Sequence, residues 1–187
     1  MKRPAGIIAL LTLQTLMACS LGQGISPIPE EVLLACPGAR RIQEEDATST
    51  ECTEIGCISG LYLTTQPSGP WPHGSYRFEI DADGELTTCT GSLPLRPCGE
   101  RSLTCDSERI LIAASGCALP ASAHGFSDIH FSGHPKQLHV KVLRDEAVVA
   151  ELQSAPMYAL SQPNGKGCDP VCCQASAILT LDTSLQP

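Results

Sequence analysis

The residues best suited to chemistry in this chain of 187 residues are its 11 cysteines, because thiols form disulfides, bind metals and carry covalent groups. Three of them, Cys168, Cys172 and Cys173, lie close together near the C-terminus. A structural zinc site combines two such close pairs, or one pair with spaced histidines. The sequence has no second close pair and no Cys-x-x-Cys redox motif, so we expect disulfides here rather than a metal.

Histidines form the second group of candidate residues. Asp128, His130 and His134 would share one face of a continuous strand, where they could bind a metal or relay a proton. Gly133 and Pro135 predict instead that the strand ends before His134. We therefore expect ordinary surface histidines and no bound cofactor, with His130 and His134 as the weak candidates for a metal site.

Other catalytic and ligand-binding motifs are absent or incomplete. Asp81-Ala82-Asp83-Gly84 begins like a calcium loop, but the required Gly and Glu positions are occupied by Leu86 and Ser92. A hairpin turn explains these four residues better. The chain has no nucleophile elbow, phosphate loop, dinucleotide fingerprint or His-Glu-x-x-His motif, and we expect no enzyme activity.

The N-terminus has the features of an export signal. Lys2 and Arg3 precede an apolar stretch from Ile7 to Met17, which is too short to span a bilayer. The following Leu16-Met17-Ala18-Cys19 resembles the lipobox of bacterial lipoproteins. The resemblance implies that residues 1–18 are a signal peptide, that Cys19 becomes the acylated N-terminus, and that several acyl chains anchor it stably. Ser20, in place of an aspartate, favours the outer membrane.

Lipidation of Cys19 leaves an even number of cysteines in an exported, oxidising compartment, which predicts up to five disulfides. Sequence alone does not determine the pairing. Short loops suggest Cys52–Cys57, Cys89–Cys98, and Cys168 with Cys172 or Cys173. The ten candidates are Cys36, Cys52, Cys57, Cys89, Cys98, Cys105, Cys117, Cys168, Cys172 and Cys173.

Composition narrows the possible partners. The net charge of −8 argues against nucleic acid, because phosphate binding needs clustered Lys and Arg. Apolar residues make up 42% of the chain but aromatics only 4%, so the core must consist mainly of aliphatic side chains.

The elements that position these residues are predicted to be short strands. Residues 19–54 are rich in Gly, Pro and polar side chains, and we interpret them as a lipidated, partly disordered tether that Cys36 and Cys52 tie down in part. Residues 55–187 alternate with period two, which predicts an all-β, disulfide-rich antiparallel sandwich in the immunoglobulin-like or jelly-roll style. The expected strands are 61–65, 76–80, 85–89, 109–114, 126–131, 138–142, 148–152 and 177–181.

Two further stretches, Pro163-Asn164-Gly165 leading to the C-terminal cysteines, and Gly74-Ser75-Tyr76-Arg77-Phe78, resemble features of uncharacterised cysteine-rich lipoproteins of myxobacteria. The resemblance implies an envelope location and a β-fold, and supplies no activity.

Three function classes remain. We expect a non-catalytic envelope module, anchored to the membrane through its lipid, that binds an envelope protein or glycan or has a structural role. The alternatives are a metal-binding or sensing lipoprotein that uses His130 and His134, and an envelope hydrolase built on distant carboxylates or a Ser–His pair.

Overall fold

The computed structural model describes residue 36 and residues 52–165 and 168–184. The predicted signal peptide, the acylated Cys19 and most of the predicted tether lie outside these residues. The described strands are β1 (Gly60–Pro67), β2 (Gly74–Ala82), β3 (Glu85–Leu93), β4 (Leu103–Cys105), β5 (Ile110–Ser115), β6 (Gly125–Phe131), β7 (Leu138–Arg144), β8 (Ala147–Ser154), β9 (Ala159–Ser161) and β10 (Cys172–Leu181), with one 3₁₀ turn, η1 (Ala121–Ala123).

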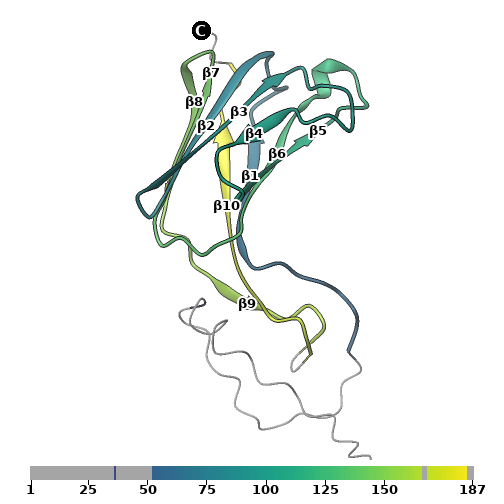
Figure 1. The fold of residues 1–187 in the computed structure, drawn as a ribbon, viewed down its shortest axis with the longest axis vertical. Coiled ribbons are helices and arrows are strands. Elements are labelled where there is room, and N and C mark those ends of the chain that lie inside the picture. The colour runs from purple at the N-terminus through teal and green to yellow at the C-terminus, as the bar shows by residue number, and fades with distance from the viewer. Residues whose placement is uncertain (1–35, 37–51, 166–167, 185–187) are drawn as a thin grey trace, which may run out of the picture.

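The strands form two sheets of five that pack face to face (Figure 1). One has the order β5-β6-β1-β10-β9 and the other β4-β3-β2-β7-β8. All neighbouring strands are antiparallel except β1 and β10, which run parallel from Gly60↔Gln174 to Pro67↔Leu181. The predicted all-β, disulfide-rich sandwich is confirmed.

Alternation of side chains explains which face of each strand is buried. In β2, Tyr76, Phe78 and Ile80 are buried, while Arg77 and Glu79 lie on the opposite face and form an ion pair at 2.9 Å. The core is mainly aliphatic, as expected. Four of its five buried aromatic residues, Trp71, Tyr76, Phe78 and Phe126, form one cluster in which the rings meet edge to face at 5.3–5.5 Å.

The hairpin turn expected at residues 81–84 lies between β2 and β3. Asp83 and Gly84 both have positive φ, the conformation of a tight hairpin turn, and the Asp81 carboxylate accepts the Gly84 N–H at 2.8 Å. Asp83 accepts the N–H of Gln137 at 2.8 Å. The turn between β7 and β8 consists of Asp145 and Glu146, which both have positive φ, and Arg144 is the last residue of β7.

All eight predicted strands are present, most of them longer than expected. The alternating pattern does not predict β4 and β9, because they have three residues each and are too short to show it.

Candidate functional site

The lower end of the molecule, which we call the base, consists of residues 36, 52–59, 161–165 and 168–173 (Figure 1). Three disulfides there join the segment before β1 to the segment at the start of β10: Cys36–Cys173, Cys52–Cys168 and Cys57–Cys172. The suggested pairs Cys52–Cys57 and Cys168 with Cys172 or Cys173 are therefore wrong. The parallel pairing of β1 with β10 brings the two segments side by side, so cysteines more than 100 residues apart are neighbours.

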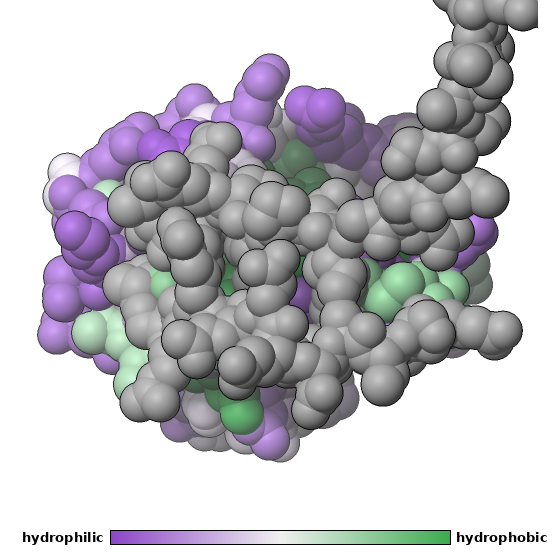
Figure 2. Space-filling model, turned by 90° about the horizontal axis from the view of Figure 1, so that it is seen from below, coloured by the Kyte–Doolittle hydropathy of each residue, from purple (hydrophilic) through white to green (hydrophobic). Residues whose placement is uncertain are grey.

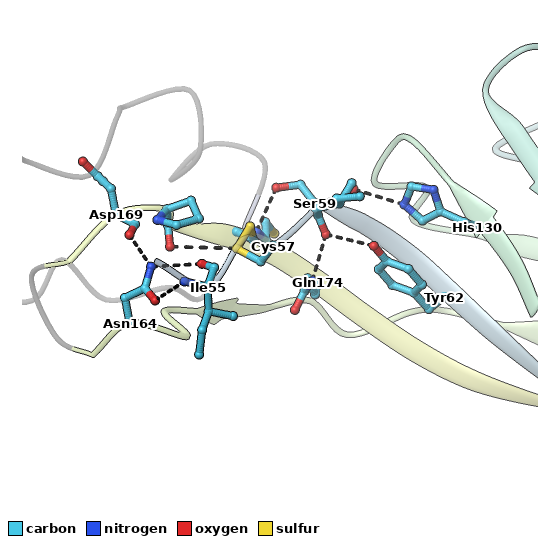
Figure 3. Close-up of a disulfide and its surroundings, with 12 residues drawn as sticks. Ile55, Cys57, Ser59, Tyr62, His130, Asn164, Asp169 and Gln174 are labelled. Atoms are coloured by element: carbon cyan, nitrogen blue, oxygen red, sulfur yellow. Dashed lines mark hydrogen bonds between the residues drawn. A yellow bond between two sulfur atoms is a disulfide. The ribbon is translucent and has the colours of Figure 1, made fainter. Parts of the chain in front are cut away.

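Asn164 links the same two segments by hydrogen bonds (Figure 3). Its side chain, only 5% exposed, accepts the Ile55 N–H at 2.8 Å and the Thr53 hydroxyl at 2.5 Å. Its amide donates to the carbonyl oxygens of Ile55 at 3.0 Å and Asp169 at 2.5 Å. All the bonding capacity of this buried amide is thus used within the base, which indicates a structural role.

Beyond the Cys57–Cys172 disulfide, to its right in Figure 3, side chains of sheet β5-β6-β1-β10-β9 continue the connection from the base to the strands. The Ile58 carbonyl accepts the Gln174 amide at 2.8 Å and the Tyr62 hydroxyl at 3.2 Å. The His130 ring lies 4.5 Å from the ring of Tyr62, and its Nε2 lies 3.4 Å from the Ser59 carbonyl oxygen.

The structure separates the candidate metal ligands. Strand β6 ends at Phe131, before His134, as predicted. His134 contacts the Cys173 carbonyl oxygen through Nε2 at 3.2 Å and packs edge to face on Tyr158. Asp128 accepts the Thr64 hydroxyl at 3.2 Å. Within residues 36, 52–165 and 168–184, no three His, Cys, Asp or Glu side chains are grouped to hold a metal ion.

The opposite end of the sandwich carries the distal loops, which we define as residues 68–73, 94–102 and 116–124 together with the 145–146 turn. The disulfide Cys98–Cys117 joins two of these loops. Cys89 pairs with Cys105 across β3 and β4, so the suggested pair Cys89–Cys98 is wrong. The ten candidate cysteines do form five disulfides, as predicted.

The buried side chain of His124 links the same two loops by hydrogen bonds. It is 8% exposed, its Nδ1 accepts the Leu95 N–H at 2.9 Å, and its Nε2–H donates to the Leu119 carbonyl at 3.0 Å. These two bonds define the neutral tautomer of the ring. The distal loops are therefore linked both by a disulfide and by a buried histidine.

A hollow of about 320 Å³ opens beside these loops. Pro67, Pro70 and Trp71 line one side, and residues 122–127 line the other. Trp71 fits because Gly125 faces it: a Cβ at Gly125 would lie 2.5 Å from the indole Cδ1. No motif in the sequence predicts this hollow. In the sequence, the hollow is indicated only by the prolines on both sides of Trp71 and by the glycine before Phe126.

The rest of the lower end is seen from below in Figure 2, where hydrophobic surface is visible beside the segments drawn in grey.

No helix among the described residues is long and apolar enough to cross a membrane. Comparison of the chain with protein-family models, with curated proteins and with solved structures finds no match.

Proposed function

We propose that this chain is a lipid-anchored protein of the bacterial cell envelope, carried to the outer membrane, whose β-sandwich is a non-catalytic binding module. The lipobox-like Leu16-Met17-Ala18-Cys19 supports the anchor. Five disulfides support an oxidising compartment, and they come from a part of the chain independent of that signal.

The observation that carries the proposal is the separation of the two ends. The chain from the anchor reaches the base at Cys36, Cys52 and Cys57, each bonded to the start of β10 or the loop before it. The distal loops lie at the far end of the sandwich (Figure 1). An anchor at Cys19 would then hold the base toward the membrane and present the distal loops away from it.

The distal hollow suits an uncharged ligand group. Its lining combines prolines, an aromatic ring and the hydroxyl groups of Ser115, Ser122 and Ser127. A loop of an envelope protein or a glycan offers the apolar faces and hydroxyl groups that such a lining can contact. Loops on a rigid sandwich are a common place for binding of this kind.

Lipidation is tested by growth with labelled palmitate. The wild type should incorporate the label and Cys19→Ala should not. Equal labelling of the two would contradict the anchor.

Binding at the distal end is tested with a photocrosslinking amino acid placed in living cells at one of two matched exposed leucines. Leu119 in the distal loops is 59% exposed and Leu86 at the other end of the sandwich is 63% exposed. We expect a discrete crosslinked species from position 119 and none from position 86. The same pattern from both positions, or none from either, would contradict a distal binding surface.

A further inference from the structure

Strand β10 has an open edge on the side that faces away from β1. Strand β9 pairs there only with Cys172, Cys173 and Gln174. From Ala175 onward no described strand pairs with that side of β10 within the sheet. Among the described residues, a backbone hydrogen bond joins this part of the chain to the second sheet at the upper end, where the Asp182 N–H donates to the Val149 carbonyl at 3.1 Å. The open stretch is therefore residues 175–178.

The path of the chain explains this opening. Strand β8 belongs to one sheet and β9 to the other, so residues 155–158 must cross between the sheets before the chain joins β10 at Ala159. The crossing leaves a groove of about 550 Å³ between itself and β10. Tyr62 and Gln174–Ser176 line one wall, and Ser154–Met157 line the other.

The other outer strands are protected against pairing, whereas this stretch is not. β4 and β9 have three residues each, β5 has a register shift between Ala113 and Ala114, and β8 carries Glu151. Short length, irregular register and charge are the usual protections of an outer strand. Residues 175–181 contain no charged residue and no proline.

Side chains around the groove indicate what would occupy it. None of its lining residues is charged, so a charged partner segment would lose solvent without gaining an ion pair. Ile178 is 59% exposed on the outer face and Met157 is 91% exposed at the rim. On the inner face Ala175 and Ala177 are small, which leaves room for an apolar side chain of an added strand.

We propose that an extended, uncharged and largely apolar segment of another protein binds in this groove by adding a strand to β10. The unpaired backbone supplies hydrogen bonds and the alternating side chains supply selectivity. A second copy of the chain fits less well, because each copy carries a net charge of −8 and the crossing residues wall the groove on its outer side. The proposal does not depend on the lipid anchor or on the distal hollow.

The test is a selection of random linear peptides on the full disulfide-bonded chain, with peptides of about 10 residues, the upper end of the usual strand length. Selected peptides are then measured against Ile178→Lys and against a matched control, Val148→Lys. Val148 is also an exposed β-branched residue on an outer strand, 46% exposed on β8. Hydrogen exchange with and without peptide locates the binding site.

We expect peptides with apolar residues at alternate positions that bind the wild type and Val148→Lys equally and Ile178→Lys about tenfold or more weakly. Amides within residues 175–178 should exchange more slowly when the peptide is bound. Failure to select any peptide, equal binding to both variants, or protection confined to the distal loops would overturn the proposal. Protection confined to the distal loops would leave the proposed function standing.

Discussion

In the sandwich, two sheets bury aromatic and aliphatic side chains against each other, whereas the buried side chains of the base are cysteines and Asn164. Cys36, Cys168, Cys172 and Cys173 are buried but do not belong to the hydrophobic core cluster. The sandwich therefore owes its stability mainly to apolar area removed from water, with two disulfides added, and the base owes its stability to three disulfides and one hydrogen-bonded amide.

Because of this difference, we expect the sandwich to unfold as a whole and the base to open locally. A hydrophobic core is shared by all the strands that surround it, so losing part of it destabilises the whole domain. The base has few apolar contacts of its own, and it can open locally while the sandwich stays folded. Substitutions in the two regions should thus differ in kind as well as in size.

The largest effect is expected from Phe78→Ala. Phe78 is fully buried and meets Phe126 edge to face at 5.3 Å. Removing its ring should lower the free energy of unfolding by about 3–5 kcal/mol, from lost burial and the cavity left behind. Urea denaturation of the oxidised protein measures this, with the exposed Leu86→Ala as a control that should change stability by about 0.5 kcal/mol or less. A small loss for Phe78→Ala would show that the disulfides, rather than the core, hold the sandwich.

Removing the disulfide that closes the shorter loop should cost more stability than removing the one that closes the longer loop. Cys89–Cys105 closes a loop of separation 16 that no other disulfide closes, and its double Ala variant should cost about 3 kcal/mol. Cys57–Cys172 has a separation of 115, but Cys52–Cys168 closes nearly the same loop. Once one of these bonds exists, the other adds little further restriction of the unfolded chain.

The double variant Cys57→Ala/Cys172→Ala should therefore be the more stable of the two, as measured by urea denaturation after mass spectrometry confirms the remaining disulfides. A larger loss than for the Cys89 and Cys105 variant would show that the base is part of the cooperative unit rather than a separate region.

The strands could be predicted from the sequence because alternation is local: Tyr76-Arg77-Phe78-Glu79-Ile80 specifies its buried face without the rest of the chain. The disulfide pairing could not, because it follows from a long-range event, the parallel pairing of β1 with β10. Short loops such as Cys52–Cys57 were the natural expectation, yet both residues bond across the β1–β10 junction. The hollow beside Trp71 was missed for the same reason, since β6 supplies Gly125, which lets the ring approach.

Single substitutions at two buried polar residues compare the sandwich with the base, with smaller expected effects. His124 in the distal loops and Asn164 in the base each connect backbone groups of separate segments. His124→Ala leaves the N–H of Leu95, a core residue, without its partner, and should lower the free energy of unfolding by about 1–3 kcal/mol. Asn164→Ala should leave the urea midpoint nearly unchanged and speed hydrogen exchange at Ile55. Similar shifts of the urea midpoint in both variants would mean that the base and the sandwich unfold together.

The smallest effect is expected at alkaline pH, where Tyr76 in the core and Tyr158 on the crossing beside the base both titrate late. Burial raises the pKa of Tyr76, whose hydroxyl donates to the Pro72 carbonyl at 2.7 Å, from 10.0 to about 12. Burial, and next the charge of Asp83, raises the pKa of Tyr158 to about 12. Because the unfolded chain loses each proton first, the stabilisation is complete below pH 10.0 and is lost as the pH rises toward about 12. Tyr76 is 2% exposed and belongs to the core, so while the sandwich stays folded its hydroxyl ionises only near the raised pKa of about 12. Tyr158 is half-buried on the crossing beside the base and can ionise by a local displacement.

Tyr76→Phe should therefore flatten the fall in stability between these pH values more than Tyr158→Phe does, as followed by urea denaturation at successive pH values. Equal flattening would place the crossing within the cooperative core and weaken the distinction between the two regions.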